Sequence, residues 1–205
     1  MKTVRNNLFF PAITGFIFLV VFISWNGYRN QKTRQKKPGA FENIEREQLT
    51  DTSGYKSRRL VLYDFEWGNP DDSASHISST GHSGTRSFYM KPWVPFSPGL
   101  WVKFKDLPES DSCWIRASGW VWFSCTPSEI KCTLVATCNH NGLNYKYMSL
   151  PLEMENLEPI QWNRVAIDYR IPPVHDKEDV LQAYFWNRGT GELLVDDFEV
   201  KFFKP

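Results

Sequence analysis

The stretch Leu193–Phe203, with the sequence Leu-Leu-Val-Asp-Asp-Phe-Glu-Val-Lys-Phe-Phe, predicts a β-strand with one buried face. Alternate residues from Leu194 to Phe202 are apolar, except for Asp196. A carboxylate on a core-facing position is costly unless a cation, a proton or several hydrogen-bond donors neutralise it. A second apolar strand that ends in acidic residues, Leu60–Glu66, lies far upstream. We predict that these two strands lie side by side and that their carboxylates share one bound cation.

The length and composition of the chain limit its architecture and its partners. The 205 residues leave room for one ordinary domain and an additional segment. A formal net charge of +1 gives no electrostatic reason to expect a nucleic-acid partner. The chain contains 12 glycines and 13 prolines, a content that favours many turns and short strands over long helices.

The four cysteines leave the redox state of the chain open. Cys125 and Cys132 flank a short segment and could form a disulfide across a hairpin. Alternatively, some or all of Cys113, Cys125, Cys132 and Cys138 are small buried apolar side chains, which is common for free cysteine. There is no Cys-x-x-Cys motif, and the four histidines show no ligand-like spacing, so a zinc site is not expected.

Residues 1–25 are predicted to be a signal-anchor. The uncharged segment Leu8–Trp25, as a helix, is long enough to cross most of a bilayer of roughly 30 Å. No cleavage pattern follows it, which favours an uncleaved anchor over a cleaved signal peptide. The basic run Arg29–Lys37 would keep the downstream chain in the cytoplasm, but long folded domains often translocate regardless of flanking charge. We therefore expect a single-pass membrane protein with its domain in the periplasm or at the cell surface.

Residues 26–59 are polar and basic, and we predict a flexible linker because such a composition cannot offset the entropy cost of ordering. The folded domain is predicted to span residues 60–205. Its segments are short and alternate between polar and apolar residues, as in Cys113–Ser124 and Val180–Trp186, and none has the period of an amphipathic helix. This pattern predicts an all-β fold: an antiparallel jelly-roll β-sandwich, preceded by one N-terminal transmembrane helix and the linker.

Four motifs follow one another along the predicted domain. They are Tyr-Asp-Phe-Glu at 63–66, His-Ser-Gly-Thr-Arg-Ser-Phe at 82–88, Trp162 with Arg164 and Val165, and Val-Asp-Asp-Phe-Glu-Val at 195–200. In this order they resemble the calcium-containing jelly-roll carbohydrate-binding modules, which are galactose-binding-like β-sandwiches. The resemblance implies a domain that binds glycans and does not catalyse a reaction.

The resemblance also implies a structural calcium ion that joins the first strand, the Ser/Gly loop and the last strand. Calcium takes six to eight oxygen ligands from carboxylates and carbonyls, which suits this set. Alternatively, Asp196 and Asp197 are strand-edge charges that accept hydrogen bonds from turn amides. The implied ligands are Asp64, Glu66, Gly81 through its carbonyl, Ser83 and Asp196.

Outward-facing aromatic residues on two strands are the candidate ligand-binding residues. Sugar rings stack their C–H patches on aromatic faces, and their hydroxyl groups need polar partners. If the two strands share a sheet, their side chains form one platform; alternatively, these rings belong partly to the core. Trp93 and Trp101, beside prolines, are expected to anchor loops. The candidate set is Arg116, Trp120, Trp122, Gln182, Tyr184 and Trp186.

No catalytic arrangement is expected from the sequence. Asp168, Glu192 and Glu199 lack the paired partner that a glycosidase needs, and His82 lacks a nucleophile motif around it. We predict a membrane-anchored, non-catalytic module whose partner is a glycan or polysaccharide. The alternative is a structural or protein-interaction β-sandwich in an extracytoplasmic membrane assembly, and an unrecognised hydrolase is the third possibility.

Overall fold

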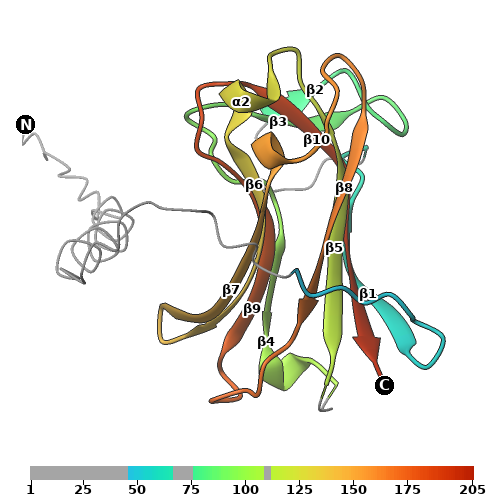
Figure 1. The fold of residues 1–205 in the computed structure, drawn as a ribbon, viewed down its shortest axis with the longest axis vertical. Helices are drawn as coiled ribbons and strands as arrows, with labels where there is room; N and C mark the ends of the chain where they lie inside the picture. Colours follow the sequence, from blue (N-terminus) through green and yellow to red (C-terminus); the bar gives the residue numbers. More distant parts are fainter. Residues whose placement is uncertain (1–45, 67–75, 109–111) are drawn as a thin grey trace, which may run out of the picture. The chain divides into compact units, whose positions relative to one another are not determined.

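The computed structural model describes residues 46–66, 76–108 and 112–205. In this part of the chain, two antiparallel sheets pack face to face as a β-sandwich (Figure 1). The prediction of an all-β, antiparallel sandwich is confirmed. The first sheet contains β1 (Lys56–Tyr63), β2 (Ile77–Ser78), β3 (Ser87–Met90), β5 (Trp114–Trp122), β8 (Asn163–Arg170) and β10 (Leu193–Lys204). The second contains β4 (Leu100–Lys103), β9 (Val180–Asn187), β6 (Cys132–His140) and β7 (Leu143–Pro151).

Short helical segments connect some of these strands. They are the 3-10 helices Phe104–Asp106 and Leu152–Met154 and the α-helix α2 (Pro127–Ile130). Thr126 caps α2 in a capping box, in which the carboxylate of Glu129 accepts a hydrogen bond from the backbone N–H of Thr126.

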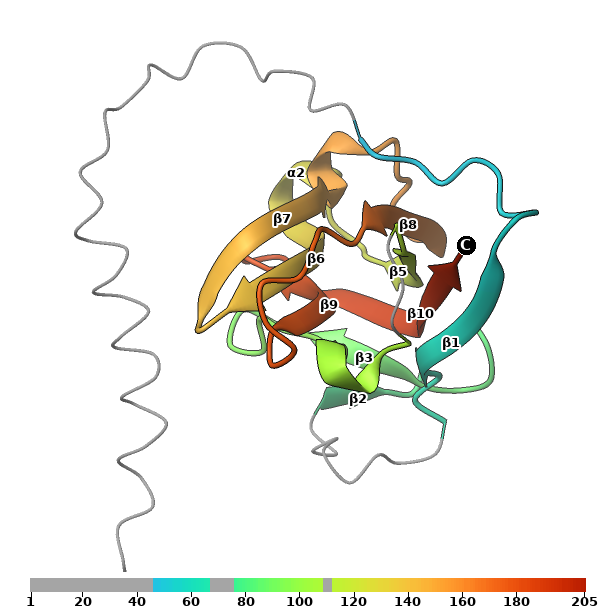
Figure 2. The ribbon, with the colours of Figure 1, turned by 90° about the horizontal axis from the view of Figure 1, so that it is seen from below.

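The two terminal strands of the domain lie side by side, as predicted. β1 pairs antiparallel with the second half of β10, and Figure 2 shows β1 beside the C-terminal end of that strand. The first half of β10 pairs with β3 on the same edge, and the whole strand pairs with β5 on its other edge. β10 is therefore the central strand of the larger sheet.

A β-bulge in the middle of β10 changes which residues face the core. The register against β5 shifts between Asp196 and Glu199, and Asp197 there has a left-handed φ of 47°. Val195 before the bulge and Phe198 after it both belong to the core. Asp196 lies directly opposite Trp120, which is on the outward face of β5. Asp196 thus lies on the outer side of the sheet, in contrast to the core-facing position predicted from strict alternation.

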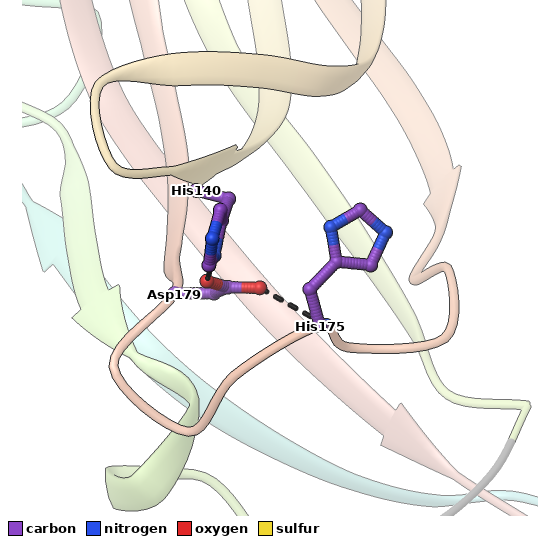
Figure 3. A group of neighbouring side chains, drawn as sticks. All are labelled: His140, His175 and Asp179. Carbon is purple, nitrogen blue, oxygen red and sulfur yellow. Dashed lines mark hydrogen bonds and ion pairs between the residues drawn. The ribbon is translucent and has the colours of Figure 1, made fainter.

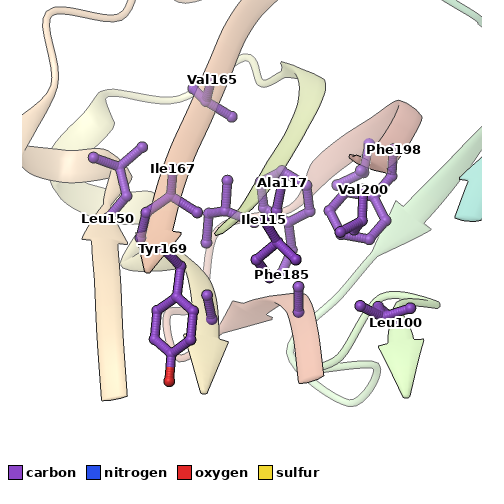
Figure 4. Packing of buried hydrophobic residues seen from close by; sticks show 14 of the residues in the cluster. Leu100, Ile115, Ala117, Leu150, Val165, Ile167, Tyr169, Phe185, Phe198 and Val200 are labelled. Atoms are coloured by element: carbon purple, nitrogen blue, oxygen red, sulfur yellow. The ribbon is translucent and has the colours of Figure 1, made fainter. Parts of the chain in front are cut away.

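The core lies between the two sheets (Figure 4). Ile115 and Ala117 of β5 and Val165, Ile167 and Tyr169 of β8 supply one side of it, as their alternation predicted. From the second sheet, Phe185 of β9 reaches across to Phe198, with ring centroids 5.5 Å apart in an edge-to-face arrangement. These alternating strands place the remaining side chains of β5 and β9 on the two outer faces.

The predicted membrane anchor requires a correction. In the described ranges, no helix is long and apolar enough to cross a membrane. The longest helix there, α2, has 4 residues, which at about 1.5 Å each span about 6 Å of a hydrocarbon core about 30 Å thick. The predicted signal-anchor, residues 1–25, lies outside the described residues. The predicted single-pass membrane architecture and localisation are therefore not supported.

Part of the predicted linker is ordered against the domain. The compact unit begins at Arg46, and the strand β1 begins at Lys56. Leu49 is buried, its N–H donates to Asp168 Oδ2 at 2.9 Å, and its carbonyl accepts from Arg116 Nη2 at 2.8 Å. Polar residues become ordered here because strand pairing and ion pairs with the sandwich offset the entropy cost. The remaining predicted linker residues, 26–45, lie outside the described residues.

The cysteines are free thiols in the structure. Cys113, Cys132 and Cys138 are buried, and Cys125 is half-buried. The alternative of small buried side chains is thus confirmed, and the Cys125–Cys132 disulfide does not form in this structure. Burial raises the pKa of Cys138 to about 11, so its thiol is protonated at neutral pH.

Candidate functional site

The predicted ligand-binding residues are divided between two sheets. β5, which carries Arg116, Trp120 and Trp122, belongs to the larger sheet, and β9 belongs to the smaller one. Both strands direct these residues away from the core, so the two groups lie on opposite outer faces of the sandwich. The condition for a single platform, that the two strands share a sheet, is not met.

On β5, Arg116 and Trp120 contact other residues of the domain. Arg116 forms a bidentate ion pair with Asp168, at 2.5 and 2.8 Å, and its hydrogen bonds to that carboxylate raise the pKa of Arg116. His82 stacks on Trp120, with ring centroids 3.8 Å apart and an interplanar angle of 13°. Trp162 meets the same imidazole edge-on. Arg116 therefore holds the segment around Leu49 against the sheet, and Trp120 holds the 81–86 loop against it.

The group on β9 lies on an open face with further aromatic residues. Trp101 of β4, Gln182 of β9, Thr137 of β6 and Tyr147 of β7 are direct cross-strand neighbours and form one row across the whole sheet. Trp101 is 60% exposed and Tyr147 is 47% exposed. Thr137 is buried within the row, and its hydroxyl donates to the carbonyl of Lys146. The exposed rings of Trp101 and Tyr147 thus lie on either side of the Gln182–Thr137 pair.

A second aromatic group adjoins this row along β9. Phe96, which is 52% exposed, stacks on Trp186 at 5.9 Å and meets Tyr184 edge-on at 5.7 Å. The guanidinium of Arg188 lies over the Trp186 ring at 5.3 Å and donates to Thr133 Oγ1 at 2.9 Å. Burial raises the pKa of Tyr184, so its hydroxyl is neutral at physiological pH.

These residues define one surface, which we call the aromatic face. Along β9, outward residues repeat about every 7 Å, and neighbouring strands lie about 4.8 Å apart. Four strands therefore give a flat surface more than about 14 Å wide, with rings and polar groups interleaved. The aromatic face consists of Phe96, Trp101, Tyr147, Gln182, Tyr184, Trp186 and Arg188.

Four of these residues, Phe96, Trp101, Tyr147 and Arg188, were missed by the reasoning from sequence. Trp101 was expected to anchor a loop, but it lies on β4 and points to solvent. Tyr147 alternates with neighbours in β7, and this signal could have placed it on an outward face. Phe96 lies between strands, and only its bridge to Trp186 brings it to the surface, so no local pattern predicts its position.

The predicted calcium ligands converge on the 81–86 loop. Asp196 Oδ2 accepts hydrogen bonds from the backbone N–H groups of His82 and Ser83 at 2.7 and 3.2 Å. Its Oδ1 accepts from the N–H of Asp197 at 2.8 Å. Burial raises the pKa of Asp196 to about 6, although these three donors act in the opposite direction. Backbone amides thus neutralise this carboxylate, which is the alternative that the sequence left open.

Glu66 is bound to the same loop by the same kind of contact. Its Oε1 accepts from the N–H groups of Thr85 and Arg86, both at 2.7 Å, which lowers the pKa of Glu66. Gly84 has a φ of 62°, and a Cβ there would lie 2.4 Å from the Glu66 carboxyl carbon, so glycine is required. The loop is therefore closely fitted around the carboxylate.

These contacts bear on whether the predicted set can hold calcium. Asp64 Oδ1 accepts from the N–H of Glu66 at 3.3 Å, within its own turn. Within the described ranges, Asp64, Glu66 and Asp196 are not found as a group with metal-ligand spacing. The carboxylates are engaged by N–H donors. Calcium binding through Asp64, Glu66, Gly81, Ser83 and Asp196 stays a prediction.

A cavity of about 1000 Å³ lies elsewhere in the domain, between Phe104, Leu107, Val174 and Phe202. None of the predicted ligand-binding residues lines it. Its Lys146 is paired with Glu47 at 2.8 Å, and its Lys105 is paired with Glu178 at 2.8 Å. The cavity is therefore largely apolar, with lysines that already have acidic partners.

Comparisons with known proteins find similarity only among solved structures. No protein-family model and no curated protein matches the chain. The N-terminal CBM22-1–CBM22-2 tandem domain of Xyn10C from Paenibacillus barcinonensis is 14% identical, with a TM-score of 0.47, over 76% of this chain and 48% of that one. The xylan-binding module CBM15 is 13% identical, with a TM-score of 0.40, over 74% of this chain and 97% of that one.

The solved structures are mostly carbohydrate-binding modules, but they also include a protein of another class. The Stig cyclase Fisc from Fischerella sp. TAU is 10% identical, with a TM-score of 0.40, over 76% of this chain and 87% of that one. At TM-scores below 0.5, these likenesses do not indicate what this chain binds. Its function is therefore argued below from its own residues.

Proposed function

We propose that this domain binds a glycan chain on its aromatic face and that it acts as a binding module without catalysis of its own. The observation that carries this proposal is the exposed row across the smaller sheet, in which Trp101 and Tyr147 flank Gln182. Soluble domains rarely expose several large rings together unless the surface binds something. The row crosses all four strands of the sheet, which suits an extended chain.

The chemistry of the face matches a polyhydroxylated ligand. The rings of Trp101, Phe96 and Trp186 offer apolar surfaces to the C–H patches of sugar rings. The amide of Gln182 can both donate and accept hydrogen bonds, and the guanidinium of Arg188 can donate them. A purely apolar partner would leave these polar groups unsatisfied, whereas sugar hydroxyls would pair with them.

The proposal is tested by affinity electrophoresis and calorimetry of the full chain against a panel of polysaccharides that includes xylan and β-1,4-galactan. We expect Trp101→Ala to weaken binding at least tenfold, which corresponds to about 1.4 kcal/mol, because its ring is a central exposed contact. The matched control is Trp122→Ala, on the opposite sheet, which should bind like the wild type.

Three other outcomes would contradict the proposal in distinct ways. Loss of binding in Trp122→Ala with full binding in Trp101→Ala would place the site on the larger sheet. Turnover of a polysaccharide would show catalysis. No retention by any polysaccharide, with loss of a specific protein partner in Trp101→Ala, would instead assign the aromatic face to protein interaction, since exposed Trp and Tyr also form hot spots of protein interfaces.

A further inference from the structure

Two histidines and an aspartate meet at one end of the sandwich (Figure 3). His140 ends β6, and His175 and Asp179 lie in the segment between β8 and β9. One ligand atom from each of the three side chains lies within 4.8 Å of the other two. Within the described residues, this is the one group of at least three His, Cys, Asp or Glu side chains with a spacing that could hold a metal ion.

The carboxylate of Asp179 is held in position by the backbone. Asp179 is 2% exposed, and its Oδ2 accepts from the N–H groups of His175 and Asp176, both at 3.1 Å. Its Oδ1 lies 2.5 Å from His140 Nδ1. Oδ1 of this fixed carboxylate is thus directed at His140.

The two imidazole rings are also oriented by their neighbours. His175 stacks on Tyr145, with ring centroids 4.2 Å apart, and meets His140 edge-on at 5.7 Å. In metal sites of proteins, contacts from surrounding residues typically fix the orientation of the side chains that bind the metal.

Tyr145 Oη is a buried polar atom beside this group. It forms no hydrogen bond of good geometry to a described residue, although the Asp179 carboxylate and the Cys138 thiol lie close enough to interact with it. A metal-bound water molecule would supply the well-placed acceptor that this hydroxyl lacks.

We propose that His140, His175 and Asp179 bind a divalent transition-metal ion of the Zn²⁺ type. Two imidazoles and one carboxylate form a common ligand set for Zn²⁺, and a fourth position then remains for water or another small ligand. The exposed side of His175 gives solvent access to that position. The ion would tie the β6–β7 turn to the segment before β9, because its ligands come from both.

The experiment uses the full, untagged chain after treatment with EDTA. Titration with Zn²⁺ in a calorimeter is expected to show one site per chain and a raised melting temperature. Co²⁺ in its place is expected to give the visible absorption of a protein-bound ion.

His175→Ala is the decisive variant, since it removes an imidazole but keeps the His140–Asp179 pair and the backbone N–H at position 175. We expect it to weaken Zn²⁺ binding at least tenfold and to melt like the EDTA-treated wild type. The matched control, His76→Ala, removes a histidine outside the group and should bind Zn²⁺ normally. Absence of Zn²⁺ binding by the wild type, or equal binding by His175→Ala, would overturn the proposal.

Discussion

Replacing Phe185 with alanine is expected to lower the free energy of unfolding by about 3–5 kcal/mol. The Phe185 side chain is fully buried between the sheets and packs edge-on against Phe198. Gly119 of β5 makes room for it, because a Cβ at position 119 would lie 3.1 Å from Phe185 Cε2. A truncated side chain would therefore leave a cavity that the close-packed core cannot fill.

The matched control for this prediction is Phe96→Ala. Phe96 has the same side chain, but it is 52% exposed, so its loss should cost less than about 1 kcal/mol. Urea denaturation measures both values. Sugar binding should show the reverse order: Phe96→Ala weakens it, and Phe185→Ala retains it under conditions in which that variant is folded. Equal destabilisation by the two changes would show that Phe96 is part of the core.

The alternation of β9 predicted from the sequence that Phe185 is buried and that Trp186 faces outward. A period of two assigns neighbours such as Phe185 and Trp186 to opposite faces, and the structure confirms this for β5 and β9. Alternation cannot show which strands pair, because that depends on contacts between distant parts of the chain. β5 pairs with β8 and β10, whereas β9 pairs with β4 and β6. The residues of the one predicted platform therefore lie on two different faces of the sandwich.

Two further features have no local sequence signal. The bulge in β10 rests on a left-handed Asp197, and the pair Asp196–Asp197 looks like regular strand in a period-two pattern. The proposed metal ligands are separated by 35 residues between His140 and His175, and the fold alone brings them together. Sequence spacing detects a metal site only where the ligands share a turn or a helix.

The bulge also underlies the second large expected effect. At pH 7, Asp196→Ala should lower the free energy of unfolding by about 2–4 kcal/mol, because three backbone N–H groups lose their acceptor in a buried position. The matched control is Asp197→Asn, next to it, because asparagine tolerates the left-handed conformation. That change should cost less than about 1 kcal/mol. Denaturation at pH 7 measures both, and equal losses would contradict the assignment.

The pH dependence of the same group separates hydrogen bonding from calcium binding. The pKa of Asp196 is about 6 in the folded state, above its ordinary value of 3.8, so the folded chain binds the proton more tightly. The part of its stabilisation that comes from this tighter proton binding is complete below about pH 4 and is lost as the pH rises through about 6, whereas the hydrogen bonds to the backbone remain. We expect the stability of the wild type, relative to Asp196→Asn, to be higher at pH 4 than at pH 7.

A calcium ion bound at Asp196 would reverse this dependence, because it requires the deprotonated carboxylate. Binding to the folded state alone would add about 2.7 kcal/mol at a Ca²⁺ concentration one hundred times the dissociation constant. Backbone N–H groups engage both oxygens of Asp196, so equal melting temperatures in EDTA and in Ca²⁺ would assign this carboxylate to hydrogen bonding alone. A melting temperature that rises with Ca²⁺ in the wild type, and not in Asp196→Ala, would instead support the calcium site that the sequence predicted.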